Sequence, residues 1–268
     1  MYNELTEHGF VVIPDFFNTH DLIFLIKEYM KSKSTLTLSP DTVVFHDVPE
    51  FVVKQLEPKL RDIIKQSPVY TDTIVPGGLF SDTTMMNLDW HQDHGTYLFF
   101  KNHNSVLKFY IPIVKPDVEK SGLSVLSYKT LAEYDSAGAE RLKGKGATRF
   151  FPEGNRTKVI EDDINQEWYL NVNIEDIKIS PKIKAGDLLL CRGDIIHRTQ
   201  DVDTHRVAIA LHSLDGNIKI SIENFIPDTE AKEEIYKINK ELIDGFKNRF
   251  TKIGKNEMNL YEWYTFDS

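Results

Sequence analysis

The sequence Trp90-His91-Gln92-Asp93-His94 holds the residues best suited to bind a metal ion. Side chains two residues apart in an extended segment point to the same face, so His91 and Asp93 can reach one ion. With a distant histidine they would form the 2-His-1-carboxylate ligand set of ferrous iron, which leaves adjacent coordination positions open. Among nine histidines and 41 acidic residues, about one such His-x-Asp/Glu pair is expected by chance. Whether this motif binds a metal must therefore be judged from the other residues of the sequence.

A second block, Gly186–Arg206, supplies both a third metal ligand and a cation. Leu188–Cys191 is predicted to be a buried strand, Gly193-Asp194 turns the chain, and His197 begins the next short strand. Arg206 then opens another apolar strand nine residues after His197. A planar guanidinium there is well explained if it binds a carboxylate bidentately in the mouth of a barrel. The alternative is a surface arginine at a strand edge.

The elements that must position these residues begin with an N-terminal strand. The apolar run Gly9–Phe17 ends at a turn, and Asn18 or Thr19 can cap the helix that follows. A second helical stretch covers Glu50–Gln66, and Pro58 within it is expected to kink the helix or to start a new one.

The hydrophobic period changes after the helical N-terminal third, residues 1–70. Short segments rich in β-branched and aromatic residues follow and predict a β-sandwich or barrel over about residues 71–226, buttressed by helices. Residues 129–173 break this rhythm and are predicted to be an insertion, which is often a lid. An amphipathic helix is predicted over residues 229–250. We expect one domain over residues 1–268.

Composition narrows the classes of function. The chain has a net charge of −9 and no long basic run, so a nucleic-acid partner is disfavoured. Its single cysteine, Cys191, excludes an intrachain disulfide and any cysteine-based zinc or iron–sulfur site. No apolar run is long enough to cross a bilayer, and the first residues do not resemble a signal peptide. We therefore expect a cytoplasmic protein without a membrane partner.

Four segments of the chain resemble the phytanoyl-CoA dioxygenase family, within the wider iron(II)/2-oxoglutarate oxygenases. They occur in the family's order and are Glu7–Phe17, Trp90–Asp93, Ser121–Leu126 and Gly186–Arg206. One departure is Ser127–Thr130, where the family commonly has a Pro-Gly-Ser-His turn beside the mouth of the active site. Substrate contacts of family members are therefore not transferred to this chain.

The resemblance implies a mainly β fold, a double-stranded β-helix or jelly-roll barrel of the cupin-like kind, backed by N-terminal and C-terminal helices. It also implies that His91, Asp93 and His197 bind iron(II). By the same resemblance, Arg206 binds the distal carboxylate of the co-substrate 2-oxoglutarate, and Thr199 supports that carboxylate with its hydroxyl.

Further cofactor-binding candidates flank this set. Asn87 is an even number of residues from His91 and Asp93, so in an extended segment it would lie on the same face. It is a candidate hydrogen-bond partner of the co-substrate, although an amide whose hydrogen bonds are satisfied in the protein interior is an equally good interpretation. Phe109 lies on a strand expected to line the site. Alternation allows either Phe109, or its neighbours Lys108 and Tyr110, to face inward.

Two other histidines are weaker candidates. His94 directly follows Asp93 and should point to the opposite face of an extended segment. His212 lies at an even spacing from Arg206 on the same predicted strand, which makes it a candidate substrate contact.

The implied reaction uses O2 and releases succinate and CO2 while a substrate C–H bond is oxidised. Related halogenases replace the carboxylate ligand by a small residue, and this chain retains Asp93, so hydroxylation is favoured over halogenation; desaturation and ring closure stay open. Two alternatives are a non-catalytic pseudo-oxygenase that binds ligands, and a jelly-roll metalloenzyme that does not use 2-oxoglutarate. The substrate is expected to be a small polar molecule, since no basic cluster matches a coenzyme A diphosphate.

Overall fold

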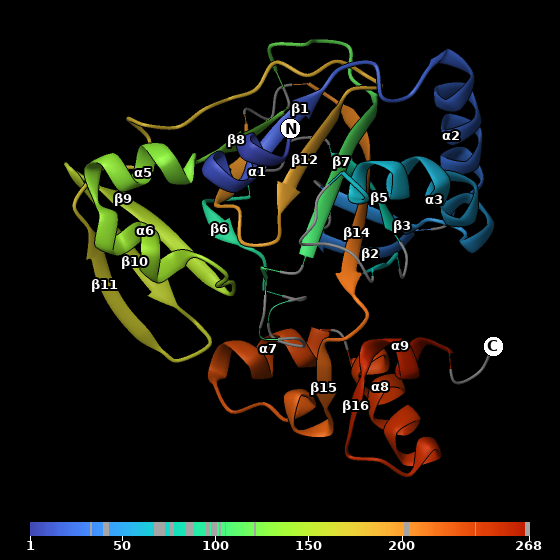
Figure 1. Cartoon of the computed structure of the whole chain (residues 1–268). Helices are drawn as coiled ribbons and strands as arrows, with labels where there is room; N and C mark the ends of the chain where they lie inside the picture. Colours follow the sequence, from blue (N-terminus) through green and yellow to red (C-terminus); the bar gives the residue numbers. More distant parts are fainter. Residues whose placement is uncertain are drawn as a thin grey trace.

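The computed structural model of the chain describes residues 1–32, 34–39, 43–66, 73–75, 78–83, 88–94, 97, 101, 103–104, 106–120, 122–200, 204–238 and 240–265. Its strands form two large antiparallel sheets and one two-stranded sheet, and helices lie beside them (Figure 1). None of the described helices is long and apolar enough to cross a membrane.

The larger sheet contains eight strands, all paired antiparallel. In spatial order they are β1 (Phe10–Ile13), β12 (Leu188–Arg192), β7 (Val106–Val114), β14 (Arg206–Asp215), β5 (Gly78–Thr83), β3 (Val43–Asp47) and β2 (Ser34–Ser39), with β4 (Thr73–Ile74) also paired to β14.

The smaller sheet contains six antiparallel strands. In spatial order they are β11 (Gln166–Leu170), β10 (Arg156–Glu161), β9 (Thr148–Glu153), β6 (His91–Gln92), β13 (His197–Thr199) and β8 (Leu123–Val125). The segment 129–173 is therefore no irregular loop. Its strands β9 to β11 extend this sheet through the pairing of β9 with β6, and they follow two short helices, α5 (Tyr128–Tyr134) and α6 (Ser136–Leu142).

The N-terminal third combines strands β1 to β3 with three helices, α1 (Tyr2–His8), α2 (Thr19–Lys31) and α3 (Glu50–Ile64). Asn18 caps α2, because its side chain accepts a hydrogen bond from the N–H of Asp21 at 3.0 Å, and the Asp21 carboxylate accepts one from the N–H of Asn18. Pro58 lies inside α3, which continues past it to Ile64 as one helix.

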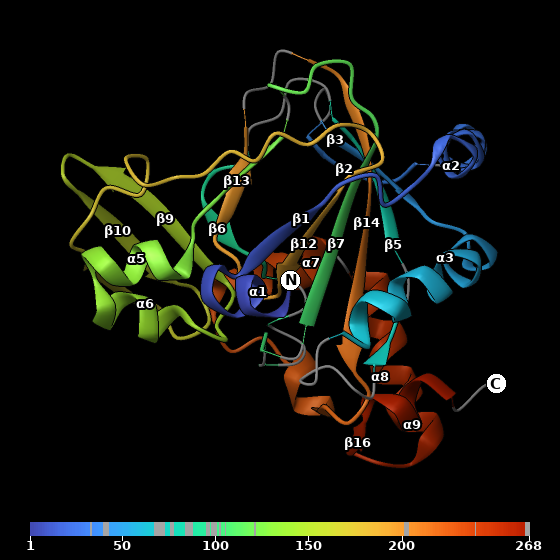
Figure 2. The ribbon, with the colours of Figure 1, turned by 45° about the horizontal axis from the view of Figure 1, so that its top comes forward.

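The larger sheet buries one face against α2 and α3 (Figure 2). Leu107, Phe109 and Ile111 of β7 pack there together with Val207, Ile209 and Leu211 of β14. Each such fully buried side chain stabilises the fold by about 1.5–3 kcal/mol. Because side chains alternate along a strand, the even-numbered positions of β7 face the other way. There Tyr110 packs with Leu123 and Val125 of β8, which belongs to the smaller sheet.

The C-terminal part is built from more elements than the one helix predicted over residues 229–250. The structure contains β15 (Lys219–Ser221), a 3-10 turn (Ile222–Phe225), α7 (Glu230–Ile238), α8 (Lys240–Ile253), β16 (Glu257–Asn259) and α9 (Leu260–Thr265). Their shared core includes Phe225, Phe250 and Met258, and it is continuous with Val106 and Leu214 at the ends of β7 and β14.

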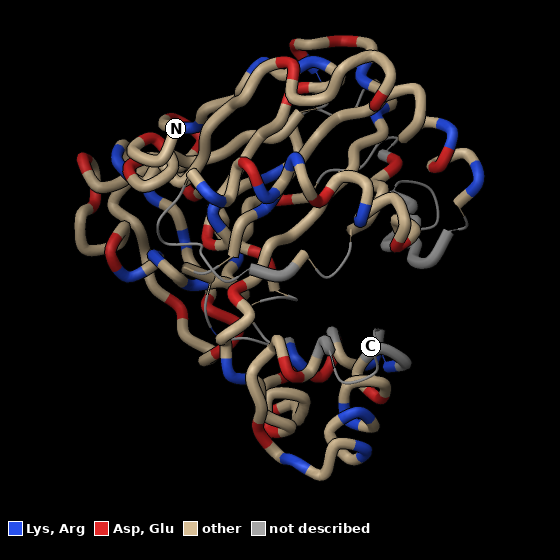
Figure 3. Tube along the Cα trace, turned by 45° about the vertical axis from the view of Figure 1, so that its right-hand side comes forward, with Lys and Arg blue, Asp and Glu red and all other residues tan. Residues whose placement is uncertain are grey.

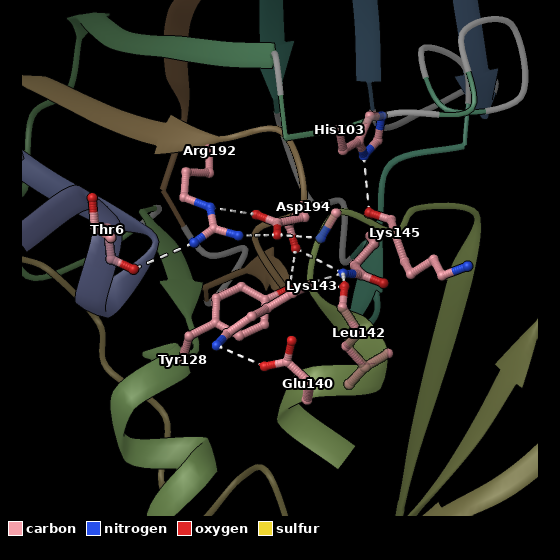
Figure 4. Close-up of polar contacts among 11 residues, drawn as sticks. Thr6, His103, Tyr128, Glu140, Leu142, Lys143, Lys145, Arg192 and Asp194 are labelled. Atoms are coloured by element: carbon pink, nitrogen blue, oxygen red, sulfur yellow. Dashed lines mark hydrogen bonds and ion pairs between the residues drawn. The ribbon is translucent and has the colours of Figure 1, made fainter. Parts of the chain in front are cut away.

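A buried ion pair fixes the turn between β12 and β13, which precedes His197. The Asp194 side chain is fully buried, forms an ion pair with Arg192 and accepts a hydrogen bond from the N–H of Gly144 at 2.7 Å. The Tyr128 hydroxyl donates to the backbone carbonyl of Asp194 at 2.8 Å. Figure 4 shows these groups converging from the N-terminal helix, α5 and the loop after α6.

Replacing Asp194 by Ala should lower the free energy of unfolding by about 3–5 kcal/mol, because the largely buried Arg192 guanidinium loses its carboxylate partner. Urea denaturation followed by circular dichroism measures this loss. Asp62→Ala is the control, since Asp62 is largely exposed and 3.8 Å from Lys65, and its loss should change stability by less than about 0.5 kcal/mol. Equal effects of the two substitutions would contradict a structural role for the Asp194 network.

Candidate metal centre

Antiparallel pairing of β6 with β13 brings the two histidines together, because His91 and His197 are direct Cα partners in this register. Their ring centroids lie 4.4 Å apart. Asp93 follows two residues after His91, and its Oδ1 lies 3.3 Å from His91 Nε2 and 3.5 Å from His197 Nε2. One ligand atom from each residue lies within 4.8 Å of the others, so the three side chains could hold one metal ion.

Both imidazoles are oriented by their other ring nitrogen. His91 Nδ1 lies 2.7 Å from the backbone carbonyl of Asp89, and His197 Nδ1 lies 3.1 Å from that of Ile195. A carbonyl oxygen only accepts hydrogen bonds, so each Nδ1 carries the proton and donates it. Each Nε2 is thereby left with a lone pair directed at the common point, which is the arrangement that metal-ligating histidines use.

The charges at this point suit a divalent cation. Burial alone would raise the pKa of Asp93, but the Lys108 ammonium and the two imidazoles outweigh burial and hold that pKa well below its usual range. Burial, with the neighbouring His91, lowers the pKa of His197 to about 3. The carboxylate is therefore ionised and the His197 imidazole neutral at physiological pH, the forms in which both bind metals.

Arg206 lies on the inner side of the larger sheet and is almost completely buried. Its Nη1 donates to the carbonyl of Gly122 at 2.6 Å, and its guanidinium carbon lies 5.7 Å from the ring centroid of Tyr110. The Tyr110 hydroxyl is itself buried and has no hydrogen-bond partner within the part of the chain that the structure describes. A guanidinium beside an unsatisfied hydroxyl is a donor pair suited to a carboxylate.

Small side chains separate Arg206 from the metal-binding residues. Between Arg206 and His212, the inner face of β14 carries only Ala208 and Ala210. Ala210 is the cross-strand partner of Tyr110, and both are partly exposed although their strands lie inside the sheet. His212 is the partner of Lys108. Along β14 the inner face therefore carries Arg206 at one end and His212, opposite Lys108, at the other, with two alanines between them.

One predicted cofactor contact, Phe109, is placed differently from the prediction. Phe109 points to the outer face of β7 and is fully buried in the core with α2 and α3, so its assignment to the site is corrected. Lys108 and Tyr110 take the inward positions. Asn87 lies outside the described residues.

Thr199 is near the site but its hydroxyl is used locally. It accepts a hydrogen bond from the N–H of Leu88 at 2.7 Å, and the backbone N–H of Thr199 donates to the Leu88 carbonyl at 3.1 Å. These contacts tie β13 to the segment that leads into Trp90 and His91. The structure thus gives Thr199 a role in positioning that segment.

His94 lies apart from the three candidate ligands, as expected from its parity. Its Nε2 is 2.8 Å from Asp162, a carboxylate that also forms an ion pair with Arg149. Lys108 was not singled out for a role by sequence reasoning. A lysine inside the otherwise apolar run Val106–Val114 was the available signal, since a buried lysine needs a counter-ion.

No protein-family model and no curated protein matches the chain. Solved structures do share its fold. One is the non-haem α-ketoglutarate-dependent epimerase SnoN from nogalamycin biosynthesis, with a TM-score of 0.57, 11% identity, and coverage of 82% of this chain and 83% of that one. Another is HygX from Streptomyces hygroscopicus with nickel and 2-oxoglutarate bound, with a TM-score of 0.52, 14% identity, and coverage of 78% and 84%.

A third structure is EctD from S. alaskensis with 2-oxoglutarate and 5-hydroxyectoine, with a TM-score of 0.54, 11% identity, and coverage of 82% of this chain and 76% of that one. At these identities the similarity establishes the shared fold.

Buried neutral histidines should make stability fall as the pH is lowered from 7 to 5. Burial lowers the pKa of His103 to about 3 and that of His212 to about 4. The folded state therefore binds fewer protons than the unfolded state below about pH 6.5, and each such histidine costs about 2 kcal/mol at pH 5. Urea denaturation at both pH values tests this. His103→Gln should remove about 2 kcal/mol of the difference, while His20→Gln, at an exposed position, is the control. A pH dependence that His103→Gln leaves unchanged would contradict the assignment.

Proposed function

We propose that the chain is an iron(II)- and 2-oxoglutarate-dependent dioxygenase that hydroxylates a small molecule. The observation that carries this proposal is the convergence of two oriented Nε2 atoms and one carboxylate oxygen, within 4.8 Å of one another. This donor set leaves room in the coordination sphere for a chelating co-substrate and dioxygen. The fold shared with SnoN, HygX and EctD, whose structures are described with α-ketoglutarate or 2-oxoglutarate, supports it.

The second half of the site fits the co-substrate. 2-Oxoglutarate has two carboxylates, and its distal one would be bound by the Arg206 guanidinium and the Tyr110 hydroxyl, which has no hydrogen-bond partner among the described groups. The other end of the molecule would then point along Ala208 and Ala210 toward Asp93. A carboxylate offers this guanidinium charge-assisted, bidentate hydrogen bonds, and a dicarboxylate such as 2-oxoglutarate can supply one.

Iron with 2-oxoglutarate supplies O2 activation coupled to release of succinate and CO2. The protein contributes position and charge. His91, Asp93 and His197 would hold the ion, and Arg206 and Tyr110 would orient the co-substrate. The carboxylate of Asp93 occupies the position that halogenases leave for chloride, which favours hydroxylation. Asp93 separates hydroxylation from halogenation only, since an epimerase and a carbocyclase share this fold.

We further propose a double-stranded β-helix of the phytanoyl-CoA dioxygenase type, a small polar substrate and a cytoplasmic location. Acidic and basic residues are interspersed along the trace in Figure 3, an arrangement that does not suggest a polyanionic partner. A reducing compartment suits both a single thiol and a ferrous ion.

Anaerobic addition of Fe(II) and 2-oxoglutarate to the protein should produce a weak visible charge-transfer band, and Asp93→Ala should abolish it because one of three ligands is lost. The same substitution, or His91→Ala, should abolish substrate-linked succinate release. His94→Ala is the matched control, since His94 pairs with Asp162 and lies apart from the ligand set, and it should retain the band. A wild-type protein that gives no band would favour a pseudo-oxygenase or a metalloenzyme without 2-oxoglutarate.

Arg206→Ala should weaken 2-oxoglutarate binding by about a hundredfold or more, because it removes the cation from a buried charge pair. Tyr110→Phe removes only a hydroxyl that donates to the same carboxylate, and should weaken binding by about tenfold. Titration of the charge-transfer band measures both values, and metal affinity should stay unchanged in each variant. Unaltered 2-oxoglutarate affinity in Arg206→Ala would show that the co-substrate binds elsewhere.

A further inference from the structure

We propose that Lys108 is a positioning residue that restricts Asp93 to one metal-binding oxygen and so keeps a coordination position free for 2-oxoglutarate. This inference rests on the proposed function. It concerns a residue of the larger sheet that reaches across to the ligand set of the smaller one. Its consequence is specific: Lys108 should weaken metal binding while it strengthens co-substrate binding.

The two oxygens of Asp93 have different partners. Oδ2 lies 2.6 Å from Lys108 Nζ, whereas Oδ1 lies 3.3 Å and 3.5 Å from the two Nε2 atoms. The ammonium thus holds one oxygen on the side of β7 and leaves the other facing the imidazoles. At this separation, with Lys108 almost fully buried, the Coulomb attraction between the ammonium and the carboxylate is strong.

Lys108 has little alternative to this contact. Only 8% of the residue is exposed, and its cross-strand neighbours are Cys191 and His212. Burial raises the pKa of the Cys191 thiol to about 12, so that thiol carries no negative charge. Among the residues that the structure describes, Asp93 is the only ion-pair partner of Lys108. A buried ammonium with one counter-ion is held to it firmly, because losing that partner would leave an uncompensated charge.

Fixing Oδ2 matters because a carboxylate can bind a metal through one oxygen or through both. If both oxygens of Asp93 bound the ion, they would use a coordination position that the chelating co-substrate needs. The ammonium opposes this by holding Oδ2. It also repels the bound cation, since two positive charges share one carboxylate. Lys108 therefore lowers the affinity for the metal and keeps one coordination position open.

The test compares three variants by calorimetric titration with nickel(II), and then with 2-oxoglutarate on the nickel-loaded protein. Lys108→Met removes the charge and with it the ion pair, and should bind nickel about tenfold more tightly and 2-oxoglutarate about tenfold more weakly. Lys108→Gln removes the charge but keeps a donor for Oδ2, so it should bind nickel more tightly with 2-oxoglutarate affinity largely retained.

Lys115→Met is the matched control. Lys115 follows the same strand and is equally buried at 8% exposure, but its Nζ donates to the carbonyls of Val118 and Ile183, each at 2.8 Å. Its loss should leave both affinities unchanged. If Lys108→Met lowered both affinities together, or left both unchanged, Lys108 would be merely structural and the inference overturned. A wild-type protein that binds no nickel would overturn the proposed function as well, so the two failures are distinguishable.

Discussion

The carboxylate of Asp93 connects the two sheets of this protein. Its Oδ1 faces the imidazoles of the smaller sheet, and its Oδ2 contacts an ammonium from the larger sheet. A partly buried carboxylate needs favourable contacts to offset its desolvation, so the strand registers of both sheets must place those contacts around it. Pairing of His91 with His197 meets this need on one side. On the other side, the outward packing of Phe109 turns Lys108 toward the carboxylate.

The surrounding structure maintains these two registers. The Arg192–Asp194 pair anchors the turn that leads into β13, and Thr199 ties β13 to Leu88 just before Trp90. A short strand such as β6, with two residues, has few ladder hydrogen bonds of its own. Its position therefore depends on the neighbours that these contacts fix. These contacts therefore also fix the position of the metal-binding residues relative to Arg206, which lies farther along the inner face.

The sequence was most informative where periodicity and spacing act locally. The two-residue spacing of His91 and Asp93 predicted a shared face, and the strand pattern around His197 and Arg206 predicted where the partners lie. The sequence alone did not decide which residues of β7 face inward, because Val106–Val114 is apolar on both faces apart from Lys108, and both faces are buried. Burial of Phe109 against α3 resolves this, and that contact joins segments far apart in the chain.

Long-range pairing also explains the remaining differences. Residues 129–173 show no local signal that β9 pairs with β6, yet this pairing makes them part of the smaller sheet; the predicted lid role is a statement about motion and stays a prediction. The predicted helix over residues 229–250 corresponds to α7 and α8, whose packing with Phe225 and Met258 depends on neighbouring segments.

The most direct test of the central claim is a crystal structure of the protein with iron(II) and 2-oxoglutarate, with anomalous diffraction measured at the iron edge. We expect a single peak about 2.0–2.2 Å from Nε2 of His91, Nε2 of His197 and Oδ1 of Asp93, with the distal carboxylate of 2-oxoglutarate on Arg206. A peak at another group, such as His94 with Asp162, or no peak at these three residues, would contradict the account.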